Sequence, residues 1–280
     1  YKEKRYTMKY VRIFVVVLFV ASLGIYGVSR VVEENSKDLT KPVITSDREV
    51  LEISCGYTQE DLLEGLTASD EKDGDLTDQI MAGTFSQFLE KGVCSTTYVV
   101  LDSSNQAASR PRRVKFTDYE SPKFTLTQPL VFQAGAGSSA VSQVGAEDLL
   151  DGDISSLVKL VDSTVNYQTA GDYSIQVEVT NSFGDVCQAS LPVHIREKSS
   201  SSLEITLTDA LIYLKPGTEF DPLSYVESVN DQQGTALDNP DVEASSNVDT
   251  DQEGCYEVGY TVSDGRGHEG ETWLVVIVRQ

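Results

Sequence analysis

Apolar and polar residues alternate along three stretches of the chain that end in the same way. These stretches are GVCSTTYVVLDSSNQ from Gly92, GDYSIQVEVTNSFGD from Gly171 and GCYEVGYTVSDGRGH from Gly254. In each, Asp102, Asn181 or Asp264 follows the glycine ten residues later and opens a corner rich in Ser, Gly and Asn. A second apolar run follows: RRVKF, ASLPVHI or TWLVVIV. Because a period of two is typical of half-buried strands, each stretch predicts a β-hairpin.

These hairpins are the ends of three tandem copies of one module. The steps between the three opening glycines are 79 and 83 residues. Each copy also starts with a short apolar run, namely PVITS from Pro42, KFTLT from Lys123 and LEITLT from Leu203. Several short strands in about 75 residues, without helical periodicity, are typical of a small antiparallel sandwich. We therefore expect three sandwich domains, at residues 42–117, 121–196 and 203–280.

The connectors between the copies are short and polar. DYESP (residues 118–122) joins the first two copies, and KSSSS (residues 198–202) joins the second and third. Compact modules on short linkers predict a semi-stiff row of separate sandwiches.

A different pattern occupies the start of the chain. From Ile13 to Val28 no residue is charged, and Val31 and Val32 extend the apolar run beyond Arg30. A helix over the uncharged run spans roughly 24 Å, less than the ~30 Å hydrocarbon core, and flanking arginines cover the difference by snorkelling. The pattern predicts a transmembrane signal-anchor helix at residues 13–32, between a cytoplasmic tail at 1–12 and a linker at 33–41.

Basic residues set the expected orientation of this helix. Six of the seven charged residues among residues 1–32 are Lys or Arg, and five of these precede the apolar run. Because such residues stay on the cytoplasmic side, we expect everything after Arg30 to be extracellular. A cleaved signal peptide is the alternative, but YGVSRVVEE (residues 26–34) has no A-x-A site, and no cysteine directly follows to take a lipid. We expect an uncleaved, single-pass anchor in the cell membrane.

The rest of the chain is strongly acidic. The formal net charge is -22 overall, and beyond residue 32 there are 43 acidic and 16 basic residues. A surface this negative repels phosphate backbones, so we expect no nucleic-acid partner. The same surface attracts divalent cations.

Two segments carry the pattern A-x-D-x-x-D-G-D-[LI]-[TS]. ASDEKDGDLT begins at Ala68, and AEDLLDGDIS begins 78 residues later, at Ala146. Their aspartates are Asp70, Asp73 and Asp75 in the first segment and Asp148, Asp151 and Asp153 in the second. Three roles are open for them: a structural turn, a weak calcium site, or an acid pair for catalysis.

A turn fits this pattern best. Asp side chains accept backbone N–H bonds in turns, and Leu76 or Ile154 then enters the core. Calcium takes roughly six to eight oxygens, whereas one loop offers at most three carboxylates and lacks EF-hand spacing. Glycosidase chemistry needs two carboxyls beside a sugar-sized cleft, and a motif at one position of two copies indicates a role in the fold. Calcium stays the open alternative, and we expect no enzyme activity and no catalytic residue.

Together, the motif and the hairpins resemble the bacterial immunoglobulin-like domains of surface proteins. That family carries A-x-D-x-x-D-G-D-[IL]-T and ends in G-x-Y-x-[VI]-x-Y-x-V-x-D-x-x-G-[NH]. Here Cys94 stands at the family's Tyr, Asn181 at its Asp, and VNDQQGTALDNP (residues 229–240) replaces the aspartate motif in the third copy. The resemblance covers residues 42–280. It implies an all-β fold of three tandem immunoglobulin-like β-sandwich domains behind one transmembrane α-helix, in an extracellular adhesive or spacer setting.

The four cysteines form no metal-binding pattern. None of Cys55, Cys94, Cys187 and Cys255 belongs to a C-x-x-C pair, and His194 and His268 are far apart in sequence, so zinc has no ligand set. No G-x-S-x-G occurs either, which argues against a hydrolase triad.

Cys55 and Cys94 are the candidate disulfide. Cys55 lies on an early strand, 15 residues before Asp70, and Cys94 opens the penultimate strand of the same copy, so the two positions can be neighbours. Export permits a disulfide, and closing this loop would stabilise the copy by roughly 3–4 kcal/mol. Two separate buried thiols are the alternative. A bridge between Cys187 and Cys255, which belong to different copies, is not expected.

The aromatic residues of the hairpins are expected in the core. Trp273 is the single tryptophan and lies in the last strand. One indole makes no row of sugar-stacking platforms, so we expect Trp273 to pack against the protein, with an exposed sugar platform as the alternative.

The sequence predicts a membrane-anchored bacterial cell-surface protein whose modules bind or adhere outside the cell, or project as a spacer. The expected partners are a protein or a cell-wall or host-surface ligand, and the lipid bilayer through residues 13–32. The alternative is a structural stalk or accessory subunit of a membrane-associated assembly. No cofactor is expected, apart from calcium at the aspartate loops.

Overall fold

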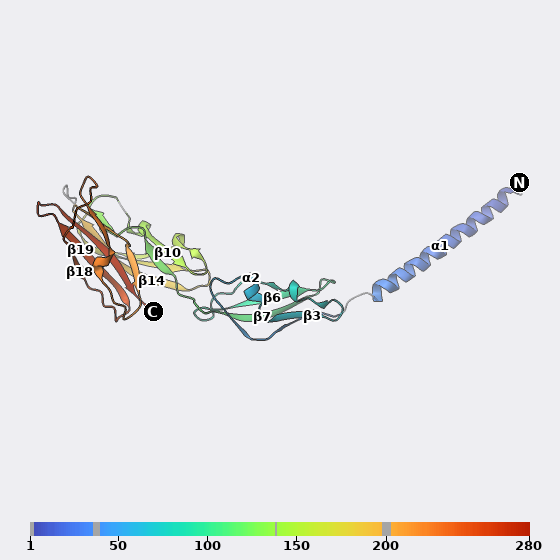
Figure 1. The fold of residues 1–280 in the computed structure, drawn as a ribbon. Coiled ribbons are helices and arrows are strands. Elements are labelled where there is room, and N and C mark those ends of the chain that lie inside the picture. The colour runs from blue at the N-terminus through green and yellow to red at the C-terminus, as the bar shows by residue number, and fades with distance from the viewer. Residues whose placement is uncertain (1–2, 36–39, 138, 198–202) are drawn as a thin grey trace. The chain divides into compact units, whose positions relative to one another are not determined.

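A computed structural model gives the fold of the chain (Figure 1). It describes residues 3–35, 40–137, 139–197 and 203–280. The start of the expected tail (residues 1–2), part of the expected linker (residues 36–39) and the KSSSS connector lie outside the described residues. The chain divides into two compact units. The N-terminal unit comprises Tyr1–Leu51, Gln59–Thr84 and Thr96–Arg113, and the C-terminal unit comprises Glu52–Thr58, Phe85–Ser95 and Val114–Gln280.

The N-terminal apolar segment is a single helix, α1 (Glu3–Asn35). Within it, Val11–Val32 has a mean hydropathy of 2.3 over its most apolar window, and none of that window is buried against the protein. By length and composition this segment can cross a membrane, a property that a signal sequence shares. The helix predicted for residues 13–32 is confirmed, and it extends beyond both predicted ends.

Strands fill the rest of the described chain and form three successive pairs of sheets, here called copies one, two and three. Copy one has the strand orders β1-β3-β4 and β2-β7-β6-β5, copy two β11-β10-β8 and β12-β13-β14-β9, and copy three β15-β17 and β16-β20-β19-β18. The all-β sandwich class predicted from the alternating runs is therefore confirmed.

The elements have the following bounds. Copy one contains β1 (Val43–Ser46), β2 (Val50–Ile53), α2 (Gln59–Leu63), β3 (Leu66–Asp70), β4 (Gly74–Asp75), β5 (Met81–Ala82), β6 (Val93–Leu101) and β7 (Ala107–Phe116). Copy two contains β8 (Lys123–Leu126), β9 (Val131–Gln133), β10 (Val144–Asp148), β11 (Gly152–Asp153), β12 (Lys159–Ser163), β13 (Gly171–Thr180) and β14 (Val186–Arg196). Copy three contains β15 (Glu204–Leu207), β16 (Leu211–Leu214), β17 (Val226–Asn230), β18 (Val242–Ser246), β19 (Gly254–Ser263) and β20 (Glu269–Val278).

The predicted hairpins are present. Strands β13 and β14 pair antiparallel from Gly171↔Ile195 to Thr180↔Val186, and β19 and β20 pair from Gly254↔Val278 to Ser263↔Glu269. In copy one, β6 and β7 are neighbours in the same sheet. Each long hairpin thus supplies the central strands on which its copy is built.

The leading segment of copies two and three contributes to both sheets of its sandwich. Strand β8 pairs antiparallel with β10, and β9 then crosses to pair parallel with β14. Copy three repeats the arrangement, because β15 pairs with β17 and β16 pairs parallel with β20. All four of these strands end their sheets and so have one paired side.

The N-terminal unit has a small core of its own. Its buried members are Ile44, Leu66, Ala68, Leu76, Ile80, Tyr98 and Val100. The Tyr98 hydroxyl donates a 2.7 Å hydrogen bond to the carbonyl of Leu62, so the one polar atom of this buried ring is satisfied. The prediction that Leu76 enters the core is confirmed, and Ile154 does the same in copy two.

Strand β20 connects the apolar cores of copies two and three within the C-terminal unit. Val275 and Ile277 of β20 belong to the buried cluster that copy two builds. The opposite face of β20 packs in the core of copy three through Leu274, Val276 and Val278. Strand β20 is therefore covered on both faces.

This packing corrects the expected row of separate modules for copies two and three. The run TWLVVIV was interpreted as an alternating strand, yet every residue from Leu274 to Val278 is apolar and buried. A strand that is buried on both faces carries a continuous apolar run instead of an alternating one. The apolar outer face of β20 is what brings the two copies together.

Candidate functional site

The first aspartate of each D-x-x-D-G-D motif holds its own loop. Asp70 is 7% exposed, and its Oδ1 accepts hydrogen bonds of 2.8 Å and 3.1 Å from the backbone N–H groups of Lys72 and Asp73. Asp148 does the same with Leu150 and Asp151, at 2.9 Å and 3.0 Å. In each loop the carboxylate accepts from backbone N–H groups of the turn, so the first aspartate stabilises the turn.

The second aspartate ties this loop to the corner of the long hairpin. Both carboxylate oxygens of Asp73 accept from Ser103, one from its N–H and one from its hydroxyl, each at 2.8 Å. Asp151 binds Ser182 in the same way, at 2.6 Å and 2.7 Å. The contact joins two loops that are 30 and 31 residues apart in sequence.

The third aspartate lies two residues before a short 3-10 helix, Thr77–Gln79 in copy one and Ser155–Leu157 in copy two. Asp75 accepts a 2.9 Å bond from the N–H of Thr77, and Asp153 accepts one of the same length from Ser155. Hydrogen bonds from these two residues hold the pKa of Asp75 and of Asp153 below the usual value.

The structure therefore supports the turn. Each of the six aspartates named by the motif accepts hydrogen bonds from protein donors. Within the described part of the chain, no group of three or more Asp, Glu, His or Cys side chains is arranged to hold a metal ion. Weak calcium binding at these loops stays a prediction.

The residue ten positions after each hairpin glycine closes the hairpin corner. Oδ1 of Asp102, Asn181 and Asp264 accepts from the N–H four residues later, at 2.7 Å, 2.9 Å and 3.1 Å. In copy two, Nδ2 of Asn181 also donates a 3.1 Å bond to Oδ2 of Asp148. Copy one has a carboxylate at this position, and Oδ2 of Asp70 is buried there without a hydrogen-bond partner among the described residues.

The predicted disulfide is not formed in the structure, where Cys55 and Cys94 are both thiols. The N–H of Cys55 donates a 2.7 Å bond to Asp118, and Cys94 is fully buried. Burial raises the pKa of Cys55 to about 12 and that of Cys94 to about 11, so both remain protonated at neutral pH. The pairing stays a prediction, and comparison of reduced and non-reduced peptide masses tests it.

A buried histidine joins copies two and three. His194 on β14 is 3% exposed, and its Nδ1 lies 2.8 Å from Oδ1 of Asp172 in copy two. Its Nε2 lies 2.9 Å from Oε2 of Glu257 in copy three. The ring also stacks on Trp273, at 4.0 Å between centroids.

Arg196 extends this contact. Its guanidinium lies 4.4 Å from the centroid of the Trp273 ring, and its Nε pairs with Glu271 at 2.9 Å. Arg196 also reaches Asp172 at 2.8 Å. Hydrogen bonds from His194 and Arg196 hold the pKa of Asp172 below its ordinary value. Trp273 packs against the protein, as the sequence predicted.

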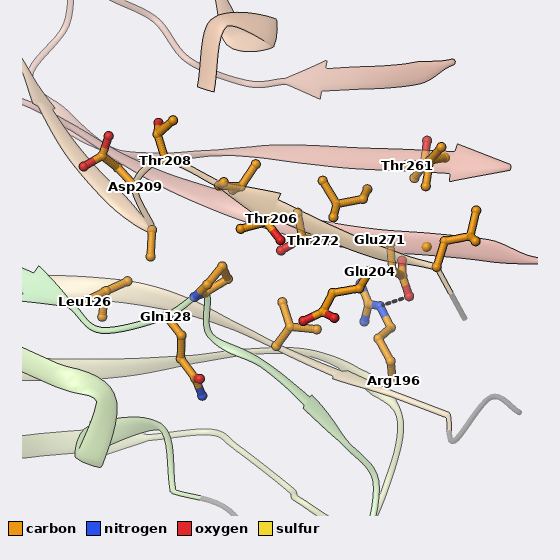
Figure 2. A pocket seen from close by; sticks show the side chains of 18 of the residues that line it. Leu126, Gln128, Arg196, Glu204, Thr206, Thr208, Asp209, Thr261, Glu271 and Thr272 are labelled. Carbon is orange, nitrogen blue, oxygen red and sulfur yellow. Dashed lines mark ion pairs between the residues drawn. The ribbon is translucent and has the colours of Figure 1, made fainter. Parts of the chain in front are cut away.

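Beside this contact lies a groove of about 1810 Å³ within the C-terminal unit. Figure 2 shows side chains that line it, among them Leu126 and Gln128 from copy two and Thr206 and Thr208 from copy three. Strands β8, β9, β15 and β16 all contribute to its lining. These four of the sheet-ending strands thus meet in one place.

The groove is acidic. It is lined by nine Asp and Glu residues, against Lys123 and Arg196 as the only Lys or Arg among the residues that line it. Both of these are already in ion pairs, Lys123 with Glu120 and Arg196 with Glu271. The arrangement can therefore accept cationic groups and hydrogen-bond donors.

The sequence did not predict this groove. No motif marks its residues, because the lining comes from two copies and depends on how they pack. The one available signal was the unbroken apolar run of β20, which indicates that this strand has a second covered face.

The described β region is an all-β array of sandwiches, and one part of it matches a known family. Residues 205–278 match the family described as bacterial surface protein, Ig-like domain. The matched residues are those of copy three, the copy that lacks the D-x-x-D-G-D motif. Over 224 residues, 76% of this chain, the sequence is 29% identical to the pesticidal crystal protein Cry22Aa of Bacillus thuringiensis. The chain spans 29% of the length of that relative.

Solved structures show remote likeness. A structure of CBM51-2 in complex with GlcNAc and INT domains from Clostridium perfringens ZmpB is 20% identical, covers 53% of this chain and 26% of its own, and has a TM-score of 0.23. Domains EC22–24 of mouse cadherin-23 are 15% identical, cover 86% of this chain and 99% of their own, and have a TM-score of 0.21. Likeness at this level carries no argument about function. The surface-domain match and the N-terminal apolar helix fit a bacterial surface protein.

Proposed function

We propose that the chain is a membrane-anchored bacterial cell-surface protein whose immunoglobulin-like modules bind a ligand outside the cell. The observation that carries the proposal is the combination of a membrane-length apolar helix, Val11–Val32, with a surface-type immunoglobulin-like domain at residues 205–278 of the same chain. One segment supplies attachment, and the other belongs to a kind of domain found on bacterial surfaces.

The charges around the helix support the proposed orientation. Five basic residues precede the apolar run, and the region beyond it is acidic. Because Lys and Arg resist translocation, the N-terminus stays in the cytoplasm and the sandwiches are exported. No catalytic role is proposed for them.

The groove between copies two and three supports the binding role. The groove encloses about 1810 Å³ and is lined by sheet-ending strands and acidic side chains, so a partner can bind in it. The packing of β20 against copy two and the His194–Trp273 stack fix its two walls relative to each other, so the groove is preformed.

Alkaline extraction of membranes from cells that make the chain tests the anchoring. We expect the chain to remain in the pellet, to be released by detergent, and to retain residues 13–32 when its mass is measured. A soluble chain that begins beyond Arg30 would overturn the anchor. A variant with Val16 and Phe19 both changed to Glu is the control, because two charges in the apolar run oppose its insertion.

A stalk or accessory subunit of a membrane assembly is the second candidate, and one observation favours it. Six aromatic rings pack together in the C-terminal unit, namely Tyr57, Phe85, Phe88, Phe116, Tyr119 and Phe183. They come from copy one, from the first connector and from the hairpin corner of copy two, so this cluster stiffens a junction as a spacer requires. Pull-down from detergent-solubilised cells separates the candidates: a co-purifying membrane protein supports the stalk, and wall or host material supports the binding role.

A further inference from the structure

We propose that the acidic groove binds a basic, extended polypeptide segment, which adds as a strand to the free edge of β15. This inference names the kind of partner that the proposed function requires. It rests on the proposed function in one respect, namely that the partner is bound outside the cell. It follows from three properties of the groove: open strand edges, continuous backbone lining and charge.

The first property is the free edge. Within the described residues, β15 pairs with β17 and with no other strand, so its second side is open over Glu204–Leu207. Directly before β15, the N–H of Leu203 already donates a 2.9 Å bond to the carbonyl of Glu269, which marks one end of this open edge. An edge strand presents a row of unpaired N–H and C=O groups, which is the template for strand addition. On the facing strand β8, the N–H of Phe124 already donates to the hydroxyl of Tyr213 at 2.7 Å. The edge of β15 is therefore the one assigned to the ligand.

The second property is that the backbone itself lines the groove. Successive side chains of a strand point to opposite faces, so a strand that shows one face contributes alternate residues. Here every residue from Leu203 to Thr208 lines the groove, and so does every residue from Lys123 to Thr127. Unbroken lining of this kind means that the strand edges face the open space. Figure 2 shows Glu204, Thr206 and Thr208 along that wall.

The third property is charge. The acidic lining residues are Glu147, Glu197, Glu204, Asp209, Asp231, Asp241, Glu243, Glu269 and Glu271. The two lining bases are engaged, as described above, so the groove attracts Lys and Arg and repels acidic chains. Hydroxyl groups of Thr206, Thr208 and Thr261 lie among the acids. The fitting ligand alternates Lys or Arg with small polar residues and lacks large apolar anchors.

The size of the groove agrees with a polypeptide. Small-molecule pockets enclose roughly 300–1,000 Å³, and this groove, at about 1810 Å³, is larger. An added strand of six residues extends about 20 Å, and a volume of this size leaves room for such a segment.

The test uses the full chain in nanodiscs of neutral lipid, which do not attract a basic probe. The probe is a fluorescein-labelled nonapeptide that alternates Lys and Thr. One comparison peptide carries N-methyl groups on alternate backbone amides, which removes strand pairing and keeps the charge. A second comparison peptide replaces Lys by Glu. Fluorescence anisotropy gives the affinity of each.

We expect the Lys/Thr peptide to bind, the N-methylated peptide to bind about tenfold more weakly, and the Glu/Thr peptide not to bind. Changing Glu204→Gln and Asp209→Asn together weakens binding about tenfold. The matched control pair, Glu219→Gln and Glu227→Gln, makes the same charge change on exposed residues outside the groove lining and leaves the affinity within about twofold.

Three results overturn the inference. The first is that the Lys/Thr peptide does not bind. The second is that the N-methylated peptide binds as tightly as the Lys/Thr peptide, which would show that charge attraction alone holds it. The third is that the groove variant and the control variant lose the same amount of affinity. The peptide-binding measurement uses purified chain and does not depend on where the chain is found in the cell. A failure of peptide binding therefore does not change the result of the membrane extraction. If the chain proves not to be attached to the membrane, the affinity of the groove for the peptides can still be measured.

Discussion

The imidazole of His194 stacks on the indole of Trp273, with ring centroids 4.0 Å apart and planes 15° from parallel. His194 belongs to copy two and Trp273 to copy three, so the stack lies across the contact between the two copies. With Glu257 on one ring nitrogen and Arg196 beside the indole, the contact combines apolar area with charge. This contact makes the groove a fixed feature of the C-terminal unit.

Removing the indole is expected to loosen this contact. Trp273→Ala deletes both the stack on His194 and the surface under Arg196, and should lower the free energy of unfolding by about 2–3 kcal/mol. Denaturant unfolding followed by circular dichroism measures it. Trp273→Phe keeps an aromatic ring and should lose less than half of that. Equal stability of the alanine variant and the parent chain would contradict the stack as a stabilising contact.

The outer face of β20 gives a second prediction. Ile277 is buried in the core of copy two, so Ile277→Ala should destabilise the chain by about 3 kcal/mol. Val186 on β14 is half-exposed, and Val186→Ala should change stability by less than about 0.5 kcal/mol. If both variants unfold at the same denaturant concentration, β20 does not pack in the core of copy two in solution.

Acid should weaken the same contact. Because His194 and Arg196 lower the pKa of Asp172 in the folded chain, Asp172 contributes stability above its unfolded pKa of about 3.9. That contribution is lost as pH falls through the lower, folded pKa. Unfolding midpoints between pH 6 and pH 2.5 should therefore fall less steeply below pH 4 for Asp172→Asn than for the parent. Parallel curves for the two chains would contradict this linkage.

The two aspartate loops differ at one position, which gives a reciprocal pair of variants. Asn181 donates to Asp148, whereas the same position of copy one holds Asp102, and Oδ2 of Asp70 is buried without a partner among the described residues. Asp102→Asn should supply a donor for Asp70. Because Oδ2 of Asp102 accepts a 3.0 Å bond from Nε2 of Gln106 that an amide nitrogen cannot accept, the gain in stability should stay below about 1 kcal/mol.

The reverse change, Asn181→Asp, removes the donor and should lower stability by about 1–3 kcal/mol. Thermal unfolding of both variants, compared with the parent, checks the pair. A fall in stability for Asp102→Asn would show that the first copy does not need this donor.

Local patterns predicted the local structure. Alternating runs located the strands of the long hairpins, and the polar residue after each run, such as Asp102, closes its corner as expected. The uncharged run at the N-terminus located α1. These features depend on neighbours in sequence, so one sequence is enough to find them.

Relations between copies could not be predicted in the same way. The groove requires Thr206 and Leu126, which belong to different copies, to line the same space, and nothing near either residue in sequence encodes that. The individual tasks of Asp70, Asp73 and Asp75 also needed the structure, because the sequence favours a turn but does not show which donor each carboxylate binds. The run from Leu274 to Val278 lacks the alternation of the other strands, and this difference indicates that both faces of the strand are buried.

Protease shaving of intact cells tests the central claim most directly, with an epitope tag after Gln280 and a cytoplasmic marker as the control. The account predicts that external protease removes the tag while the cytoplasmic marker survives, and that both are lost after detergent. A tag that resists protease on intact cells and is cleaved only after detergent would contradict the display of the sandwiches outside the membrane.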